Sequence, residues 1–175
     1  MKRKEKQPAL FLDRDGVINV DTAYLHKIED FDFIDGIFDL CKRAQEKGYL
    51  IVVVTNQSGI ARGHYSEEEF ETLTHWMVEQ FAEAGIQISG VYHCPHHPDI
   101  TGPCRCRKPE PGMLLDAAED LNIDLRQSLL VGDKERDIEA AIRSGVPVQY
   151  LFDPQHDNKD SKATAVVRTL KEVKC

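Results

Sequence analysis

Polar side chains follow three apolar runs of this 175-residue chain, and their types suit the transfer of a phosphoryl group. Asp13 and Asp15 come directly after the first run. Thr55 comes after the second run, and Asp133 comes just after the third. If the three runs are parallel strands, their carboxyl ends share one edge of the sheet, where ligands bind. The sequence therefore predicts that these distant groups meet at one site.

The acidic residues offer both a metal site and a nucleophile. Asp13 and Asp15 are two positions apart, so an extended backbone points both side chains the same way. Together with Asp133 they supply the hard oxygen ligands that Mg²⁺ prefers. One carboxylate can attack phosphorus to form an aspartyl-phosphate, and the other can protonate the leaving oxygen and later activate water. We therefore expect a magnesium-dependent phosphoryl-transfer site.

Phosphoryl transfer also needs donors for the equatorial oxygens. Thr55 offers a hydroxyl, and Lys108 or Lys134 offers a cation. Taken singly, each feature has an ordinary alternative. An Asp-x-Asp pair or a Thr-Asn pair can belong to a turn, a lysine can be a solvated charge, and the acids of 132–137 can complement a helix N-terminus. Their occurrence together, each at the end of an apolar run, favours a site.

The elements that would position these residues alternate along the chain. Strands are predicted at 9–12, 50–54, 90–93, 128–131 and 146–152, and helices at 37–44, 66–81, 112–121 and 135–144. This alternation implies crossover connections, and hence a three-layer α/β fold with a Rossmann-like parallel sheet. We expect one phosphatase domain over 1–175, with its core at about 9–152. Residues 153–162 are predicted as a loop, and about 163–173 as a short last helix.

A cysteine-rich segment lies just before Lys108. Three thiolates and one imidazole make a closed tetrahedral set for zinc, which would be structural. His93 and His97 are alternative ligands, and the segment could also be an incidental thiol-rich loop. A zinc-pinned loop would fix the two cations that follow it over the substrate. The expected zinc ligands are Cys94, His96, Cys104 and Cys106.

Composition excludes several classes of protein. Lys and Arg number 22 against 30 Asp and Glu, so the formal net charge is −8. A chain this acidic lacks the electrostatic footprint of a nucleic-acid or membrane-surface binder. The basic N-terminus is followed by only a short apolar run, whereas a membrane span needs roughly 20 apolar residues. We expect a cytoplasmic monomer with no nucleic-acid or membrane partner.

Four motifs of the chain resemble those of the haloacid dehalogenase superfamily of phosphohydrolases. They are Asp13-Arg-Asp15-Gly16-Val17, Thr55-Asn56, Lys108-Pro109 and Gly132-Asp133-x-x-x-Asp137. The resemblance covers about residues 9–152 and implies a haloacid dehalogenase-like fold. It also implies the roles of nucleophile for Asp13, general acid/base for Asp15, and phosphoryl stabilisation for Thr55 and Lys108. Mg²⁺ would rest on Asp13, Asp133 and the backbone carbonyl of Asp15, with Asp137 supporting the site indirectly.

The zinc loop is similar to that of the heptose 1,7-bisphosphate phosphatases within this superfamily, as are segments 13–19, 55–63 and 106–112. This resemblance implies removal of the 7-phosphate from D-glycero-D-manno-heptose 1,7-bisphosphate through a phosphoaspartate. Such a reaction serves nucleotide-activated heptose synthesis for lipopolysaccharide or a related glycan. The implied substrate contacts are Asp13, Arg14, Asp15, Asp21, Thr22, Ala23, Tyr24, Thr55, Asn56, Gln57, Ser58, Arg107, Lys108 and Lys134.

Two other functions remain open from the sequence. Histidinol-phosphate phosphatases share the zinc loop and differ in rim residues, although they more often have Thr at the position of Val17. A phospho-accepting signalling domain also combines an acidic cluster, a Thr and a Lys, but its acceptor usually follows a middle strand. The chain has no room for a large cap domain, so specificity should come from a rim at 21–24, Arg62 and Arg107. A nucleic-acid 3′-phosphatase is disfavoured by the net charge.

Overall fold

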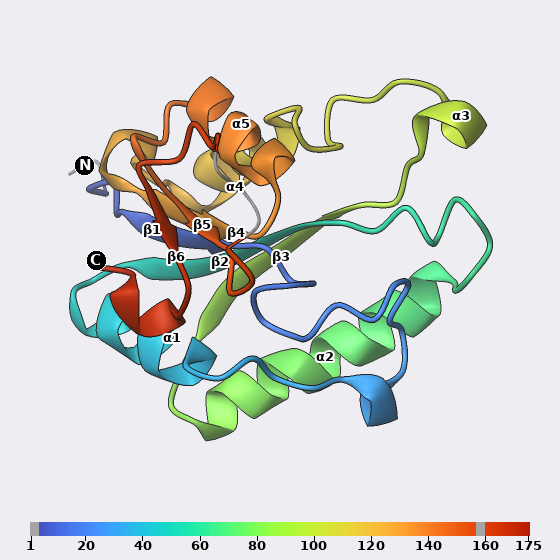
Figure 1. Ribbon diagram of the computed structural model, residues 1–175, viewed down its shortest axis with the longest axis horizontal. Helices are drawn as coiled ribbons and strands as arrows, with labels where there is room; N and C mark the ends of the chain where they lie inside the picture. The colour runs from blue at the N-terminus through green and yellow to red at the C-terminus, as the bar shows by residue number, and fades with distance from the viewer. Residues whose placement is uncertain (1–3, 157–159) are drawn as a thin grey trace.

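The computed structural model describes residues 4–156 and 160–175. Its centre is a six-stranded sheet in the order β3-β2-β1-β4-β5-β6, in which all neighbouring strands are parallel (Figure 1). The strands are β1 Ala9–Leu12, β2 Leu50–Asn56, β3 Ile88–Cys94, β4 Leu129–Gly132, β5 Val148–Phe152 and β6 Ala165–Val167. The first five strands confirm the sequence prediction, as does the parallel α/β architecture.

Two helices cover each face of the sheet (Figure 1). Helices α1 Ile37–Glu46 and α2 Glu67–Glu83 pack on one face, where Leu40, Met77 and Phe81 are fully buried. Helices α4 Gly112–Leu121 and α5 Glu135–Ser144 pack on the other. All four residues of β1 are buried, because a parallel strand between two helical layers has no solvated face. The chain is thus a three-layer sandwich with β1 at its middle.

Two long connections stand at the carboxyl ends of the strands. Residues 13–36, between β1 and α1, form a flap whose regular structure is the 3₁₀ helix η1 Ile28–Asp30. Residues 95–111, between β3 and α4, carry the cysteines and the short helix α3 Pro98–Thr101. Neither connection contains a cap domain, as the sequence predicts. The site beneath them is therefore bordered by loops.

The C-terminal segment differs from its prediction. A helix is expected at about 163–173, but the structure has strand β6 at Ala165–Val167 followed by the 3₁₀ helix η3 Leu170–Glu172. β6 pairs with β5 as an edge strand. The β-branched pair Val166 and Val167 favours a strand, and pairing with an open sheet edge outweighs a weak helical pattern. The helix prediction is wrong for the first half of this segment.

Candidate active site

The end of β1 places Asp13 against a buried lysine. The side chain of Lys108 is only 1% exposed, and its Nζ donates to Asp13 Oδ1 at 3.0 Å and to the carbonyl of Val54 at 2.9 Å. The same Nζ lies 2.6 Å from Asp137 Oδ1. Burial alone would lower the pKa of Lys108, but Asp13 and Asp137 raise it above its usual range. Lys108 therefore stays an ammonium ion beside Asp13.

Three carboxylates converge around this lysine. Ligand oxygens of Asp13, Asp133 and Asp137 all lie within 4.8 Å of one another. Burial, and then the charge of Asp137, raises the pKa of Asp133 to about 6, and the same two causes raise the pKa of Asp13. Lys108 contacts Asp13 and Asp137, and Lys134 Nζ lies 3.9 Å from Asp133 Oδ2. Asp133 Oδ1 is buried with no hydrogen-bond partner in the described part of the chain. Such a set of oxygen atoms fits a divalent cation.

Two local features of the backbone make this convergence possible. Gly16 has φ of +89°, and a Cβ there would lie 2.1 Å from Asp133 Oδ2. The turn after Asp15 therefore needs glycine for both its conformation and the approach of Asp133. In the first turn of α5, Asp137 Oδ2 accepts from the backbone N–H groups of Asp133 and Lys134 at 3.1 Å each. Asp137 thus shapes the loop that carries Asp133.

Asp15 is held by donors from three directions. Its Oδ1 accepts from Arg14 Nη2 and from Asn19 Nδ2, both at 3.0 Å. Its Oδ2 accepts from Gln57 Nε2 at 3.1 Å. Arg14 is 1% exposed and also donates to the carbonyl of Leu25, which ties the flap to this carboxylate. Asp15 is therefore fixed in one orientation beside Asp13.

Asn56, at the end of β2, anchors the loop that carries the lysine. Its Oδ1 accepts from the backbone N–H of Lys108 at 3.0 Å, and its Nδ2 donates to the carbonyl of Lys108 at 3.3 Å. These paired bonds link two segments that are 52 residues apart. Asn56 thereby sets the position from which Lys108 reaches Asp13.

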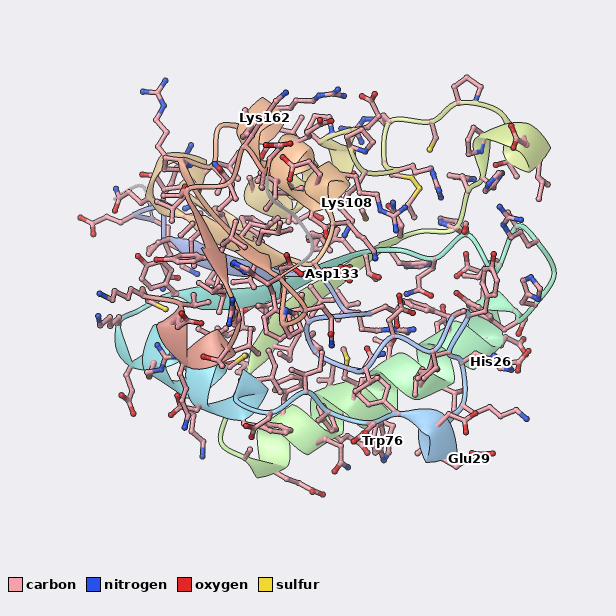
Figure 2. All side chains as sticks on the ribbon, viewed as in Figure 1. His26, Glu29, Trp76, Lys108, Asp133 and Lys162 are labelled. Carbon is pink, nitrogen blue, oxygen red and sulfur yellow. A yellow bond between two sulfur atoms is a disulfide. The ribbon has the colours of Figure 1, made fainter. Side chains whose placement is uncertain are left out.

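These groups open into a cavity of about 310 Å³ at the carboxyl edge of the sheet. Figure 2 places Lys108 and Asp133 near one another in the middle of the molecule. Of the predicted site residues, Arg14, Thr22 and Thr55 do not line the cavity. Thr55 is buried behind Gln57, and Arg14 lies under the flap. The predicted residues that do line it are Asp13, Asp15, Asp21, Ala23, Tyr24, Asn56, Gln57, Ser58, Arg62, Arg107, Lys108, Asp133 and Lys134.

Three arginines border the outer part of this cavity: Arg62, Arg107 and Arg136. Burial lowers the pKa of Arg107, and so do the charges of Arg136 and Arg62. Arg62 contacts the ring of His97, and Arg107 donates to the carbonyl of His96. Within residues 4–156 and 160–175, no ion pair engages any of the three. These three arginines, called the cationic rim below, are therefore not held in ion pairs by the described chain.

The cysteine loop brings three sulfur atoms together. Cys104 Sγ lies 3.6 Å from that of Cys94 and 3.7 Å from that of Cys106, and Cys94 and Cys106 are joined by a disulfide. Two sulfurs on one tetrahedral zinc lie roughly 3.8 Å apart, since each Zn–S bond is about 2.3 Å. The spacing of Cys104 thus suits a shared metal. His96 does not join this group within the described residues, so its role as fourth ligand stays a prediction.

Comparison with known proteins identifies the family. A HAD-hydrolase-like family model matches residues 105–173. A Yersinia pestis protein named D-glycero-beta-D-manno-heptose-1,7-bisphosphate 7-phosphatase is 50% identical over 149 residues, covering 82% of this chain and 79% of the relative. A Vibrio cholerae protein of the same name is 47% identical over 175 residues, covering 95% and 94%. This chain belongs to that family.

Solved structures agree with membership of the heptose-1,7-bisphosphate 7-phosphatase family. D,D-heptose 1,7-bisphosphate phosphatase from B. bronchiseptica, whose crystal structure holds magnesium and phosphate, superposes with a TM-score of 0.81 and 31% identity over 93% of each chain. A putative HAD-like phosphatase from Mesorhizobium loti gives a TM-score of 0.81 and 39% identity, covering 86% of this chain and 74% of the other. The haloacid dehalogenase-like fold predicted from the motifs is therefore confirmed.

Three residues that line the cavity of this family member were not predicted from the sequence as site residues: Gly59, Tyr65 and Arg136. Tyr65 is buried just before α2, and its hydroxyl donates to Gln57 Oε1. Arg136 is exposed in the first turn of α5. A phenol before a helix and an arginine on an amphipathic helix have no distinctive spacing. One weak signal exists for Arg136, because it follows Lys134 by two positions at the strand edge that carries the site.

Proposed function

We propose that this chain is a magnesium-dependent phosphatase that removes the 7-phosphate of D-glycero-D-manno-heptose 1,7-bisphosphate through a phosphoaspartate, in nucleotide-activated heptose synthesis. Membership of the family supports the reaction, and the cluster of Asp13, Asp15, Asp133 and Lys108 supports the mechanism. The observation that carries the choice of a bisphosphate is the cationic rim formed by the three arginines.

In this mechanism Asp13 attacks the phosphorus, and the bond from phosphorus to the sugar oxygen breaks. Asp15 gives its proton to that leaving oxygen, and then takes a proton from the water that attacks the phosphoaspartate. The second step breaks the bond between Asp13 and phosphorus, so inorganic phosphate leaves, Asp13 is again a carboxylate and Asp15 again carries its proton. Lys108 balances charge at Asp13 in both steps. These roles agree with the hydrogen bonds that each residue makes.

The donor set around Asp13 fits Mg²⁺. Asp13 and Asp133 would hold the ion together with the backbone carbonyl of Asp15, and the buried unpartnered Oδ1 of Asp133 is the atom that most needs it. When bound, the ion would offset the negative charge of the phosphoryl group and of the carboxylates. Asp137 faces Lys108 and the backbone instead, so we assign it a supporting role.

Zinc is the metal that we propose for the cysteine loop, in its reduced form. Cys94, Cys104 and Cys106 supply three thiolates, and His96 is the proposed fourth ligand. The loop joins the active site directly, because Arg107 follows Cys106 and donates to the carbonyl of His96 at 3.3 Å. A metal there would hold Arg107 over the cavity and has no open position for chemistry.

The rim distinguishes the two candidate substrates by charge. A heptose bisphosphate carries a second phosphate, which can accept from Arg62, Arg107 and Arg136 while its other phosphate meets Asp13. Histidinol phosphate carries an ammonium group at that end, which three guanidinium groups would repel. The rim therefore favours the bisphosphate over histidinol phosphate. Cytoplasmic location and a monomeric state stay predictions of the sequence.

The deciding experiment measures phosphate release in the presence of Mg²⁺. The substrates are both anomers of heptose 1,7-bisphosphate, and histidinol phosphate, with phosphorus NMR on each product. We expect preferential loss of the 7-phosphate, with one anomer favoured. A preference for histidinol phosphate would contradict the substrate and keep the mechanism. A phosphoprotein that forms but persists for many minutes would instead support a signalling domain.

A further inference from the structure

The buried side-chain amide of Gln57 connects Asp15 to Thr55. Gln57 is 2% exposed, and its Nε2 donates to Asp15 Oδ2 at 3.1 Å and to Thr55 Oγ1 at 2.9 Å. Its Oε1 accepts from the hydroxyl of Tyr65, which is itself buried. All three polar contacts of the amide are therefore made within the protein, although Gln57 lines the cavity.

The orientation of this amide follows from the chemistry of its neighbours. An ionised carboxylate can only accept hydrogen bonds, so the atom facing Asp15 must be the nitrogen of Gln57. The oxygen is then left for Tyr65, whose phenol donates to it. Burial raises the pKa of Tyr65 to about 12, so its hydroxyl keeps its proton. Tyr65 thus stabilises the orientation in which both N–H bonds of Gln57 point at catalytic groups.

The hydrogen bonds from Gln57 determine which atoms of Asp15 and Thr55 stay available for proton transfer and hydrogen bonding. Asp15 Oδ1 already accepts from Arg14 and Asn19, so Oδ2 is the oxygen that is free to carry the transferred proton. Gln57 occupies one lone pair of Oδ2 and leaves the other for that proton. Thr55 accepts from Gln57, and its own hydroxyl proton meets a protein acceptor only at 3.5 Å, the carbonyl of Asn56. Within the described residues that hydroxyl proton therefore has no close protein acceptor.

We propose that Gln57, held by Tyr65, is a positioning residue that couples the proton-transferring oxygen of Asp15 to the buried hydroxyl of Thr55. This inference rests on the proposed function and assigns Gln57 a role other than the substrate contact that the family resemblance implies. Gln57 has no N–H left to donate to a sugar. Its loss should therefore slow the chemical steps and leave binding intact.

The test uses single turnovers with enzyme in excess of heptose 1,7-bisphosphate. The rate at saturating enzyme reports the chemical steps, and the half-saturating enzyme concentration reports binding. Gln57→Leu removes both N–H donors at nearly the same side-chain size and adds no charge that would repel a phosphate. We expect its saturating rate to fall at least tenfold, part of the roughly 10²–10⁴-fold that a positioned acid contributes, with half-saturation within about twofold of wild type. Tyr65→Phe should lower the same rate by less, again without weakening binding.

Tyr92→Phe is the matched control, because it removes a phenol hydroxyl that donates to Asp120 near the C-terminal end of α4, and Tyr92 does not line the cavity. It should leave both quantities unchanged. Weaker binding with an unchanged rate in Gln57→Leu would make Gln57 a substrate contact and overturn the proposal, as would wild-type rates in both variants. If the wild type prefers another phosphate ester, the proposed substrate fails, and the same ratios measured with that ester still test the coupling.

Discussion

At the scale of single residues, the site packs three carboxylates together in a largely buried place, which is unfavourable for the stability of the fold. Carboxylate oxygens of Asp13, Asp133 and Asp137 lie within 4.8 Å of one another, with Lys108 against the first and third and Lys134 Nζ 3.9 Å from the second. Like charges at this distance repel strongly in a buried environment, and burial adds to the cost of each carboxylate. The cluster therefore lowers the stability of the metal-free protein, and a bound cation would offset that loss.

Asp13→Asn should abolish turnover and, at the same time, stabilise the metal-free protein. The amide cannot form a phosphoaspartate, so phosphate release should fall to background. Removing one of three buried negative charges should stabilise the metal-free protein by about 1 kcal/mol, which raises the Tm by roughly 2–4 °C for a chain of this size. Calorimetry in a chelator and a phosphate-release assay would measure both.

Asp39→Asn is the matched control for this prediction. Asp39 is exposed on α1 and pairs with Arg43 at 2.9 Å, so its loss should leave turnover unchanged and the Tm equal or slightly lower. Substantial turnover in pure Asp13→Asn protein would contradict the nucleophile assignment. A lower Tm would instead show that the bond from Lys108 to Asp13 outweighs the repulsion.

At the scale of elements, the sequence predicts helices and strands that carry their own periodic pattern or capping motif. It misses a strand that forms only because a neighbouring strand is there to pair with it. Buried β-branched runs mark β2 reliably, and the capping box of Ser66 and Glu69 marks the start of α2, where both reciprocal bonds are present. β6 was missed because a three-residue edge strand owes its existence to β5 and not to its own pattern.

The site, too, has residues that the sequence pattern predicts and residues whose position depends on neighbouring segments. Strand ends placed Asp13, Thr55 and Asp133 correctly at one edge, because the direction of parallel strands dictates it. The links formed by Tyr65 and Arg136 depend on how loops and a helix terminus fold back over that edge. No spacing rule in the sequence encodes such contacts.

The cysteine loop is the element whose metal is most open to test. Cys104 Sγ is close to both neighbouring sulfurs, so Cys104→Ala removes a thiolate from the proposed zinc set. Loss of one structural ligand should abolish stoichiometric zinc and lower activity about tenfold or more, because Arg107 and Lys108 follow the loop directly. Zinc content by mass spectrometry and turnover on the bisphosphate would be measured on the same reduced preparation.

Cys175→Ser serves as the control for thiol chemistry outside the loop. Cys175 is partly exposed at the C-terminus, where its carbonyl accepts from Lys47 Nζ. The variant should keep both zinc and turnover. Unchanged zinc content and turnover in Cys104→Ala would refute the structural-metal proposal.

At the scale of the whole molecule, two electrostatic effects oppose each other. The chain carries a formal net charge of −8, which repels an anionic substrate at long range. The rim of Arg62, Arg107 and Arg136 attracts that substrate at short range. No helix in the described residues is long and apolar enough to span a membrane. The balance of the two electrostatic effects decides how salt changes the capture of substrate.

The ionic-strength dependence of kcat/KM for heptose 1,7-bisphosphate shows which effect dominates. The screening length is about 10 Å at 0.1 M salt and about 3 Å at 1 M, so high salt weakens even rim contacts in the open mouth of the cavity. We expect kcat/KM to fall several-fold as salt rises, because the substrate's second phosphate comes much closer to the rim than to most of the acidic surface. If salt screened only the net negative charge of the chain, kcat/KM would rise with salt.

Arg136→Gln should reduce the fall of kcat/KM with salt. The double variant Arg136→Gln/Arg62→Gln should make kcat/KM independent of salt or make it rise. Arg126→Gln is the matched control, since Arg126 is exposed in η2 Leu125–Gln127, ahead of β4 and therefore at the opposite edge of the sheet. It changes the net charge by the same amount and should keep the wild-type slope. If wild-type kcat/KM rises with salt, the net charge governs capture and the rim is not the second-phosphate site. A fall in slope with Arg136→Gln but not with Arg126→Gln would tie the attraction to the cavity mouth.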